Sequence, residues 1–159
     1  MAKIISLTKG KTTLVDDDDY KWVCQWKWYF HTGGYAARTQ RMPNGKRVTV
    51  RMHRQVMQDP YRTNGMDVDH VNLNRLDNRR ANLRFCTRGE NVQNSPKRSD
   101  NNSGYKGVSY NKLLKKWTAS IHTKDIKLWK HFKSPVDAAK QYDQWAKEIY
   151  GEFARMNFT

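Results

Sequence analysis

The sequence has few cysteines and no long apolar run, and each lack excludes a class of protein. Its two cysteines, Cys24 and Cys86, lie far apart and form no CxxC pair. A zinc ribbon or a disulfide framework is therefore not expected, and both thiols are predicted to be buried and inert. No segment approaches the roughly 20 apolar residues that a membrane span needs, and the apolar stretch in MAKIISLTKGK is too short for a signal peptide. We therefore expect a protein of the reducing cytoplasm.

Acidic residues are also scarce relative to basic ones. The chain has 15 Asp and Glu against 30 Lys and Arg, which gives a net charge of +15. Such an excess of positive charge is typical of proteins that bind a polyanion. Ribosomal proteins and basic membrane-surface proteins share it, so charge alone does not select DNA. With 159 residues, the chain has room for one ordinary domain or two small ones.

Four polar residues stand out in the segment 68–94. Asp69 and His70 are adjacent, Asn82 follows His70 by twelve residues, and Asn91 follows Asn82 by nine. Carboxylate and amide oxygens are hard ligands that suit Mg²⁺ or Mn²⁺, and a neutral imidazole can take a proton from an attacking water. The alternative is a polar loop whose Asn and Asp residues merely form turns. The complete series favours a metal-dependent site that hydrolyses phosphodiesters.

Local signals predict the elements that carry these residues. Residues 87–90, TRGE, form a capping box, in which the Thr and Glu side chains satisfy backbone donors at a helix start. A helix is therefore expected over 88–95, because a proline follows. Upstream, short apolar runs at 66–71 and 83–86 flank a polar loop. The predicted order is strand, polar loop, strand and helix, with the first strand ending at His70 so that its ring can reach the site.

These residues, together with the DNR and NLR sequences between them, resemble the HNH endonucleases, specifically the phage and intron-encoded type with His-Asn-Asn in place of His-Asn-His. The resemblance implies an α+β fold with a ββα-metal core at about 66–95 and added β-hairpins. It also implies DNA hydrolysis with one Mg²⁺ or Mn²⁺ per active site. Asp69 and Asn91 would bind the metal, His70 would be the general base, and Asn82 would orient His70 and brace the loop.

The segment before this motif is predicted to form short hairpins and helices around a small core. Residues 4–15 indicate two strands around Lys9-Gly10. The acidic run 16–19 could be a metal site, but it is better explained as a helix start, where acids interact favourably with the dipole. The tryptophans of 22–28 could stack on bases, but they are predicted to pack a core.

Turns at 33–34 and 44–45 bracket two alternating runs and predict a basic hairpin that contacts phosphates. His53 follows this hairpin, where related HNH proteins carry a His-Arg pair; it is either part of the metal site or a structural or phosphate-contacting residue. Asn94 shares a helix face with Asn91 and could be a second ligand, a DNA contact or a helix-end residue. The predicted DNA contacts in this half are Arg38, Arg47, Arg51, Arg79 and Arg84, of which the last two could instead brace the fold.

A second module is predicted after a linker. Residues 1–96 form the nuclease domain, 97–103 the linker and 104–159 the second domain. Three strand-like runs precede a helix that starts at Ser134-Pro135 and ends at Gly151. This order predicts a three-stranded antiparallel sheet packed on one helix. From residue 97 to residue 133 there are ten Lys and Arg but only two Asp, so the sheet side should be strongly positive.

The sequences YKGV, KWTASI, AAKQYDQWA and GEFARMNF resemble the plant ethylene-response-factor (APETALA-type) DNA-binding domain over about 55 residues. In that family the sheet lies in the major groove, with Arg and Trp reading bases. Lys106 matches one such arginine. WKHF, however, replaces LGxF, and four other contact positions differ. The DNA-sequence preference of the plant family is therefore not transferred to this chain. Those four positions are Ser109, Asn111, Ser120 and His122. The candidate contacts are Lys106, Asn111, Lys116, His122 and Lys124, while Trp117, Trp129, Tyr142 and Trp145 are predicted to be core.

The sequence therefore predicts a DNA endonuclease of the phage homing type, acting in the cytoplasm of a bacterial host. The N-terminal domain would cleave double-stranded DNA, and the second domain would supply affinity and site selection. Because one such site acts on one strand at a time, a monomer should nick, and a homodimer or two successive events would cut both strands. One alternative is a DNA-binding regulator built on an inactive nuclease scaffold. Another is an RNA-binding or ribosome-associated protein, which explains the charge but not the motif.

Overall fold

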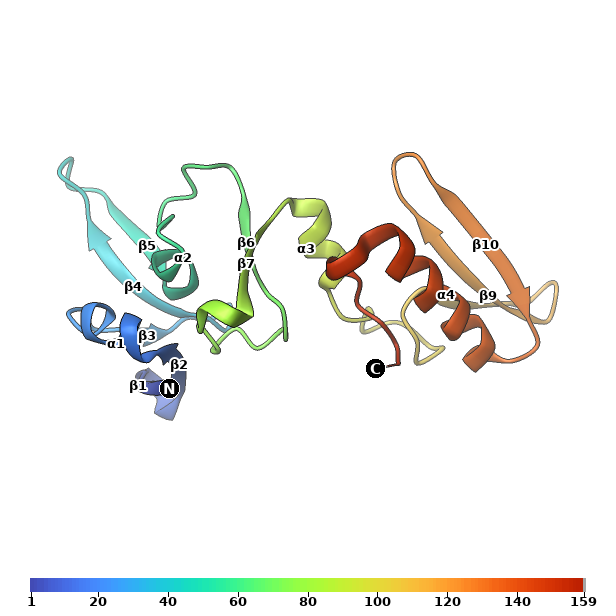
Figure 1. Cartoon of the computed structure of the whole chain (residues 1–159), viewed down its shortest axis with the longest axis horizontal. Coiled ribbons are helices and arrows are strands. Elements are labelled where there is room, and N and C mark those ends of the chain that lie inside the picture. Colours follow the sequence, from blue (N-terminus) through green and yellow to red (C-terminus); the bar gives the residue numbers. More distant parts are fainter. Residues whose placement is uncertain (159) are drawn as a thin grey trace. The chain divides into compact units, whose positions relative to one another are not determined.

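The structure, a computed structural model that describes residues 1–158, divides into two compact units. The first unit spans Met1–Asn91 and the second begins at Val92. Both mix helices and strands (Figure 1), as expected for an α+β protein. None of the helices within 1–158 is long and apolar enough to cross a membrane.

The first unit is built from three small antiparallel sheets and short helices. The sheets are β1-β2, β3-β4-β5 and β6-β7. Its strands are β1 (Ala2–Ser6), β2 (Thr12–Asp16), β3 (Tyr29–Phe30), β4 (Ala36–Arg41), β5 (Arg47–Arg51), β6 (Asp67–His70) and β7 (Leu83–Cys86). Its helices are α1 (Asp17–Val23), α2 (Met52–Val56) and the 3-10 turns Thr8–Gly10 and Arg80–Asn82, while α3 (Arg88–Asn94) crosses into the second unit.

The acidic run and the tryptophans have the structural roles that we predicted. Asp17, Asp18 and Asp19 lie in the first turn of α1. The Asp19 carboxylate is buried and accepts two hydrogen bonds from Arg80, at 2.7 and 2.8 Å. Trp28 is buried in the core beside Val15, Val23, Met52 and Val56, and the other two tryptophans pack against that core.

The cysteines fit the expectation only in part. Cys86 at the end of β7 is buried, and burial, together with the nearby negative charge of Asp69, raises the pKa of its thiol to about 11. It therefore stays a neutral, unreactive thiol. Cys24 is exposed, so the prediction of two buried thiols is wrong for this residue: it follows the last turn of α1, where the chain turns outward.

The second unit has the predicted sheet and helix. Its strands β8 (Val108–Asn111), β9 (Lys116–His122) and β10 (Lys127–Phe132) form an antiparallel sheet in the order β10-β9-β8. Helix α4 (Pro135–Tyr150) lies along one face of that sheet (Figure 1) and continues into a 3-10 turn, Gly151–Phe153. Ser134 caps α4 by accepting hydrogen bonds from two backbone N–H groups.

The core of the second unit lies between α4 and the inner face of its sheet. Ala139, Tyr142 and Ala146 on α4 are buried, as their helical spacing predicted. They pack against Val108, Ala119 and Ile121 of the sheet. Trp129, by contrast, is 63% exposed. The prediction that it belongs to the core is wrong, because it alternates with Leu128 and points to the other face of β10.

The division between the units lies within α3, rather than in the segment 97–103 where we expected a linker. That segment is tied to the second unit by a polar turn. The Asn101 side chain donates to the carbonyl oxygen of Tyr105 (2.9 Å) and accepts from the backbone of Ser103 (3.0 Å). Its polar composition therefore reflects turn formation and not a free connector.

Candidate active site

Strands β6 and β7 bring the central motif together. β6 ends at His70, as predicted, and the antiparallel register places Asp69 opposite Arg84 and His70 opposite Leu83. Both motif residues are buried, with exposed fractions of 5% for Asp69 and 4% for His70. A buried carboxylate and a buried imidazole at a strand end need specific partners, and these partners define the site.

The partner of Asp69 is Arg84. The Arg84 guanidinium donates to Oδ2 of Asp69 from Nε (3.2 Å) and from Nη2 (3.0 Å). Directly opposed side chains of an antiparallel pair interact in this way. Because Arg84 is only partly exposed and holds this carboxylate, it braces the site. Of the two roles left open for Arg84, bracing the fold or contacting DNA, this pairing favours the first.

Asn78 is in contact with His70, because its Oδ1 lies 3.4 Å from Nε2 of His70. Asn78 is fully buried, and its amide also donates to Oγ1 of Thr13 (2.7 Å). Burial lowers the pKa of His70 and outweighs the contact with Asn78 and the charges of Asp69 and Asp77, which act in the opposite direction. The imidazole is therefore neutral at neutral pH, as a general base must be.

Asn82 braces the loop between β6 and β7. Its Oδ1 accepts from the backbone N–H of Asn72 (2.9 Å), and its Nδ2 donates to the carbonyl oxygen of Asp77 (2.8 Å). Both bonds are internal to the loop, so Asn82 shapes the segment that delivers Asn78 to His70. The sequence analysis assigned both roles to Asn82; it noted Asn78 only as part of the DNR sequence and gave it no role.

Two aromatic rings flank His70. The His53 ring, from α2, lies edge-on at 5.0 Å between centroids, and the Tyr35 ring lies 6.0 Å away. His53 is buried, and its Nδ1 makes no hydrogen bond. Burial, followed by the positive charges of its neighbours, lowers the pKa of His53 well below its ordinary value. Of the roles left open for His53, the structure shows a neutral ring packed against His70.

The predicted metal ligands differ in their surroundings. Asn91 is partly exposed on α3, which begins with the predicted capping box: Thr87 N–H donates to Glu90 (2.6 Å), and Glu90 N–H donates to Thr87 (3.2 Å). Asn94, whose role was left open, is buried. The described residues contain no cluster of three or more His, Cys, Asp or Glu side chains that could hold a metal. A carboxylate and an amide oxygen still suit a hard cation, provided that water and a DNA phosphate complete the shell. These two oxygen donors are thus of the type that Mg²⁺ prefers, and the ion would take its remaining ligands from water and DNA.

Most arginines near the motif are already paired. Arg79 donates to the buried Asp77 carboxylate from Nε and Nη2, both at 2.7 Å. Arg38 is buried, stacks on the Trp26 ring at 4.3 Å and donates to Gln55 (2.9 Å). Arg38 is therefore a core residue rather than the predicted DNA contact, and Arg79 mainly stabilises the loop.

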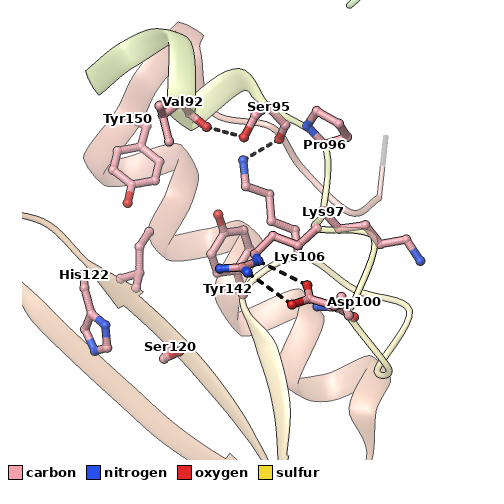
Figure 2. A pocket seen from close by; sticks show the side chains of 14 residues that line it. Val92, Ser95, Pro96, Lys97, Asp100, Lys106, Ser120, His122, Tyr142 and Tyr150 are labelled. Carbon is pink, nitrogen blue, oxygen red and sulfur yellow. Dashed lines mark hydrogen bonds and ion pairs between the residues drawn. The ribbon is translucent and has the colours of Figure 1, made fainter. Parts of the chain in front are cut away.

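In the second unit, Lys106 is not directed at solvent (Figure 2). Its ammonium donates to the carbonyl oxygens of Gln93 and Ser95, the latter at 2.7 Å. Burial lowers its pKa to about 8. Lys106 therefore holds the chain just after α3, which corrects its prediction as a DNA contact.

The outer face of the second sheet carries the other candidates. The register places Ser109, Thr118 and His131 in one row and Ser120 beside Trp129 in the next. Lys116, His122 and Lys124 are exposed, as a surface contact requires. Asn111 instead accepts from the Leu114 backbone N–H at 3.0 Å and so closes the turn. Trp129 is the residue that sequence reasoning missed on this face.

Comparison with known proteins agrees with the geometry of the first unit. Residues 60–93 match the family model of the HNH endonucleases. An uncharacterised HNH endonuclease of Acanthamoeba polyphaga mimivirus is 29% identical over 149 residues, which cover 94% of this chain and 76% of that protein. No solved structure matches the chain. HNH nucleases generally depend on a divalent metal ion. The match and the relative together identify an HNH endonuclease domain in this chain and support a DNA-cleaving enzyme.

Proposed function

We propose that the protein is a metal-dependent DNA endonuclease that hydrolyses phosphodiester bonds in duplex DNA, with His70 as the general base. The observation that carries this proposal is the burial of a neutral His70 beside Asp69 at the end of β6, within the segment that matches the HNH model. A structural histidine would not need a carboxylate neighbour held by its own arginine. A histidine that acts as a base at neutral pH needs a pKa at or below its ordinary value, and burial lowers the pKa of His70.

The chain's own groups account for the proton transfer and the geometry. His70 takes the proton of the attacking water, and Asn78 and His53 limit the rotation of its ring. Asn82 keeps the loop in the shape that delivers Asn78. Asp69 and Asn91 would hold the divalent ion, Mg²⁺ or Mn²⁺, whose charge stabilises the phosphate and the leaving oxygen. Hydrolysis by in-line attack leaves a 5′-phosphate and a 3′-hydroxyl.

The second unit would supply affinity and choose the site. Its exposed sheet face combines Lys116, His122 and Lys127 with the accessible ring of Trp129. Basic and aromatic side chains on one surface suit a nucleic-acid backbone and its sugars and bases. The resemblance to the ethylene-response-factor domain supports the same use. We place the protein with the viral homing type of endonuclease as part of this proposal, and expect a monomer to nick one strand.

The direct test is cleavage of supercoiled plasmid DNA that carries the natural flanking sequence, in Mg²⁺, Mn²⁺ or EDTA. Nicking should depend on the metal and should disappear in His70→Ala while DNA binding persists. His131→Ala, which removes an exposed histidine of the second unit, is the matched control and should cleave at the wild-type rate with saturating DNA. Tight DNA binding without cleavage in either metal would instead establish a DNA-binding regulator.

A further inference from the structure

Two exposed arginines share one aromatic ring beside His70. Arg51 lies at the end of β5 and Arg75 lies in the loop after β6. Their guanidinium carbons are 5.0 Å and 4.9 Å from the centroid of the Tyr35 ring. A guanidinium over a tyrosine face is attracted by the ring's electrons. Tyr35 is therefore in contact with both positive charges and stabilises each of them.

This arrangement is placed at the catalytic imidazole. The Tyr35 centroid is 6.0 Å from that of His70 and 5.0 Å from that of His53. Arg75 is also anchored, because its Nη1 donates to the carbonyl oxygen of Gly33 at 2.8 Å. The Arg75 guanidinium is thereby fixed against the ring that lies beside both imidazoles. The two guanidinium groups thus lie on the side of the hairpin that faces His70, and not at its far end.

The two arginines also lack the acid partners that the neighbouring arginines have. Arg54, Arg80 and Arg84 each pair with a buried or half-buried carboxylate. Among residues 1–158, no carboxylate pairs with Arg51 or Arg75. Two exposed guanidinium groups without a counter-ion, fixed beside a neutral base, form a site for an anion.

We propose that Arg51 and Arg75, held on Tyr35, bind the DNA phosphate that is cleaved, a role that rests on the proposed nuclease function. Guanidinium groups match the paired oxygens of a phosphate and can strengthen their hydrogen bonds as negative charge builds up during attack. Asp69 and Asn91 would meet the same phosphate through the metal, while the arginines would contact it directly. Arg51 was predicted only as one of several backbone contacts, and Arg75 was not predicted.

The first test uses single-turnover cleavage by the full chain with saturating DNA. Arg51→Gln/Arg75→Gln should cut at least about 100-fold more slowly, the loss typical of one or two lost transition-state donors. Its DNA affinity in EDTA should fall less than about tenfold, because most phosphate contacts remain. Arg75→Lys, which keeps a positive charge, should retain part of the cleavage rate that Arg51→Gln/Arg75→Gln loses. The matched control is Lys11→Gln/Lys21→Gln, which removes two exposed charges elsewhere on the first unit and should leave the rate unchanged.

A second measurement does not depend on cleavage. Inorganic phosphate is titrated into the metal-free protein, and the Tyr35 ring and arginine Nε–H resonances are followed by NMR. These resonances should shift in the wild type and in the Lys11→Gln/Lys21→Gln control, and the Tyr35 shift should be absent from Arg51→Gln/Arg75→Gln. A wild-type cleavage rate in Arg51→Gln/Arg75→Gln, or no phosphate-dependent shift at Tyr35, would overturn the proposed phosphate site. If the wild type binds phosphate at Tyr35 but never cleaves DNA, the nuclease proposal fails and the anion site stands.

Discussion

At the scale of single residues, Asn78 does more in this site than its sequence context suggests. Its fully buried amide joins Thr13 of β2 to His70 of β6, two residues that are far apart in the chain. The motif itself gives the positions of Asp69, His70, Asn82 and Asn91, because their spacing is fixed by the chemistry. The DNR sequence includes Asn78 but does not reveal its role, since a buried contact to a distant strand leaves no local pattern.

Replacing Asn78 tests this role. Asn78→Ala should destabilise the first unit by about 1–3 kcal/mol, because it leaves buried polar groups without their partner. It should also slow cleavage while leaving DNA affinity in EDTA unchanged, since His70 would lose an orienting contact. Urea unfolding and single-turnover cleavage measure the two effects. Asn102→Ala, at an exposed position of the second unit, should change neither; equal effects in both variants would contradict a specific role for Asn78.

Buried His53 predicts how stability depends on pH. Its pKa in the folded protein is well below the ordinary value because burial disfavours the imidazolium. Above a pH of about 6.5 both folded and unfolded forms are neutral, and the full stability is present. As the pH falls below 6.5, the unfolded chain takes up a proton that folded His53 does not, so stability is lost at up to about 1.4 kcal/mol per pH unit.

His53→Phe should remove this contribution. The free energy of unfolding of the variant should fall less steeply than that of the wild type between pH 6.5 and the onset of acid unfolding. Urea unfolding at a series of pH values measures the difference in slope. Parallel curves for the two proteins would show that His53 is protonated in the fold. The exposed His122 offers a control, because His122→Phe should leave the slope unchanged.

Surface side chains were the least predictable residues. Arg38 and Trp129 were assigned from residue type and position, and Lys106 from its match to a family position. Each lies in an environment opposite to the assignment. Tertiary packing explains all three environments. The lysine binds carbonyl oxygens at the end of α3, the arginine stacks in a core, and the tryptophan faces solvent. Charge and aromaticity set what such a residue can do, whereas the fold sets whether solvent or protein surrounds it.

At the scale of secondary-structure elements, short-range signals predicted the structure well. The capping box at Thr87 and the Ser134-Pro135 start each begin a helix where expected, because their hydrogen bonds are local. The hairpin between β4 and β5 turns at Gly45, whose φ of +80° favours glycine. The end of the first unit was not predictable in this way, since it depends on contacts between distant segments.

One close approach between elements gives a sharp prediction. Gly107, just before β8, has a φ of +72°, and a Cβ atom there would lie 1.9 Å from the Tyr142 ring of α4. Gly107→Ala should therefore destabilise the second unit by about 3 kcal/mol or more, through steric overlap and backbone strain. Thermal unfolding should show the lowered transition. Gly104→Ala, with a similar φ of +81° but no atom near its Cβ, separates strain from overlap and should cost clearly less.

At the scale of the whole molecule, the sequence predicted two modules and a strong positive charge, and the structure divides into two units. The charge predicts salt-sensitive binding to DNA, because each phosphate contact releases counter-ions. The proposed division of the chain into a cleaving and a binding unit does not follow from charge. It follows from where the neutral base lies and where the unpaired basic and aromatic side chains lie.

This division predicts that binding and chemistry can be separated by mutation. Lys116→Ala/Trp129→Ala changes two exposed side chains of the second unit and should weaken DNA binding by about 10-fold or more, since a stacked aromatic alone contributes roughly 1–3 kcal/mol. It should also reduce the slope of log affinity against log salt by about 0.9, the share of one phosphate contact. At saturating DNA its single-turnover rate should equal that of the wild type. His70→Ala should show the reverse, with full affinity and no cleavage. If the double variant also lost its rate at saturating DNA, the second unit would contribute to the chemical step, and the two units would have to be treated as one catalytic assembly.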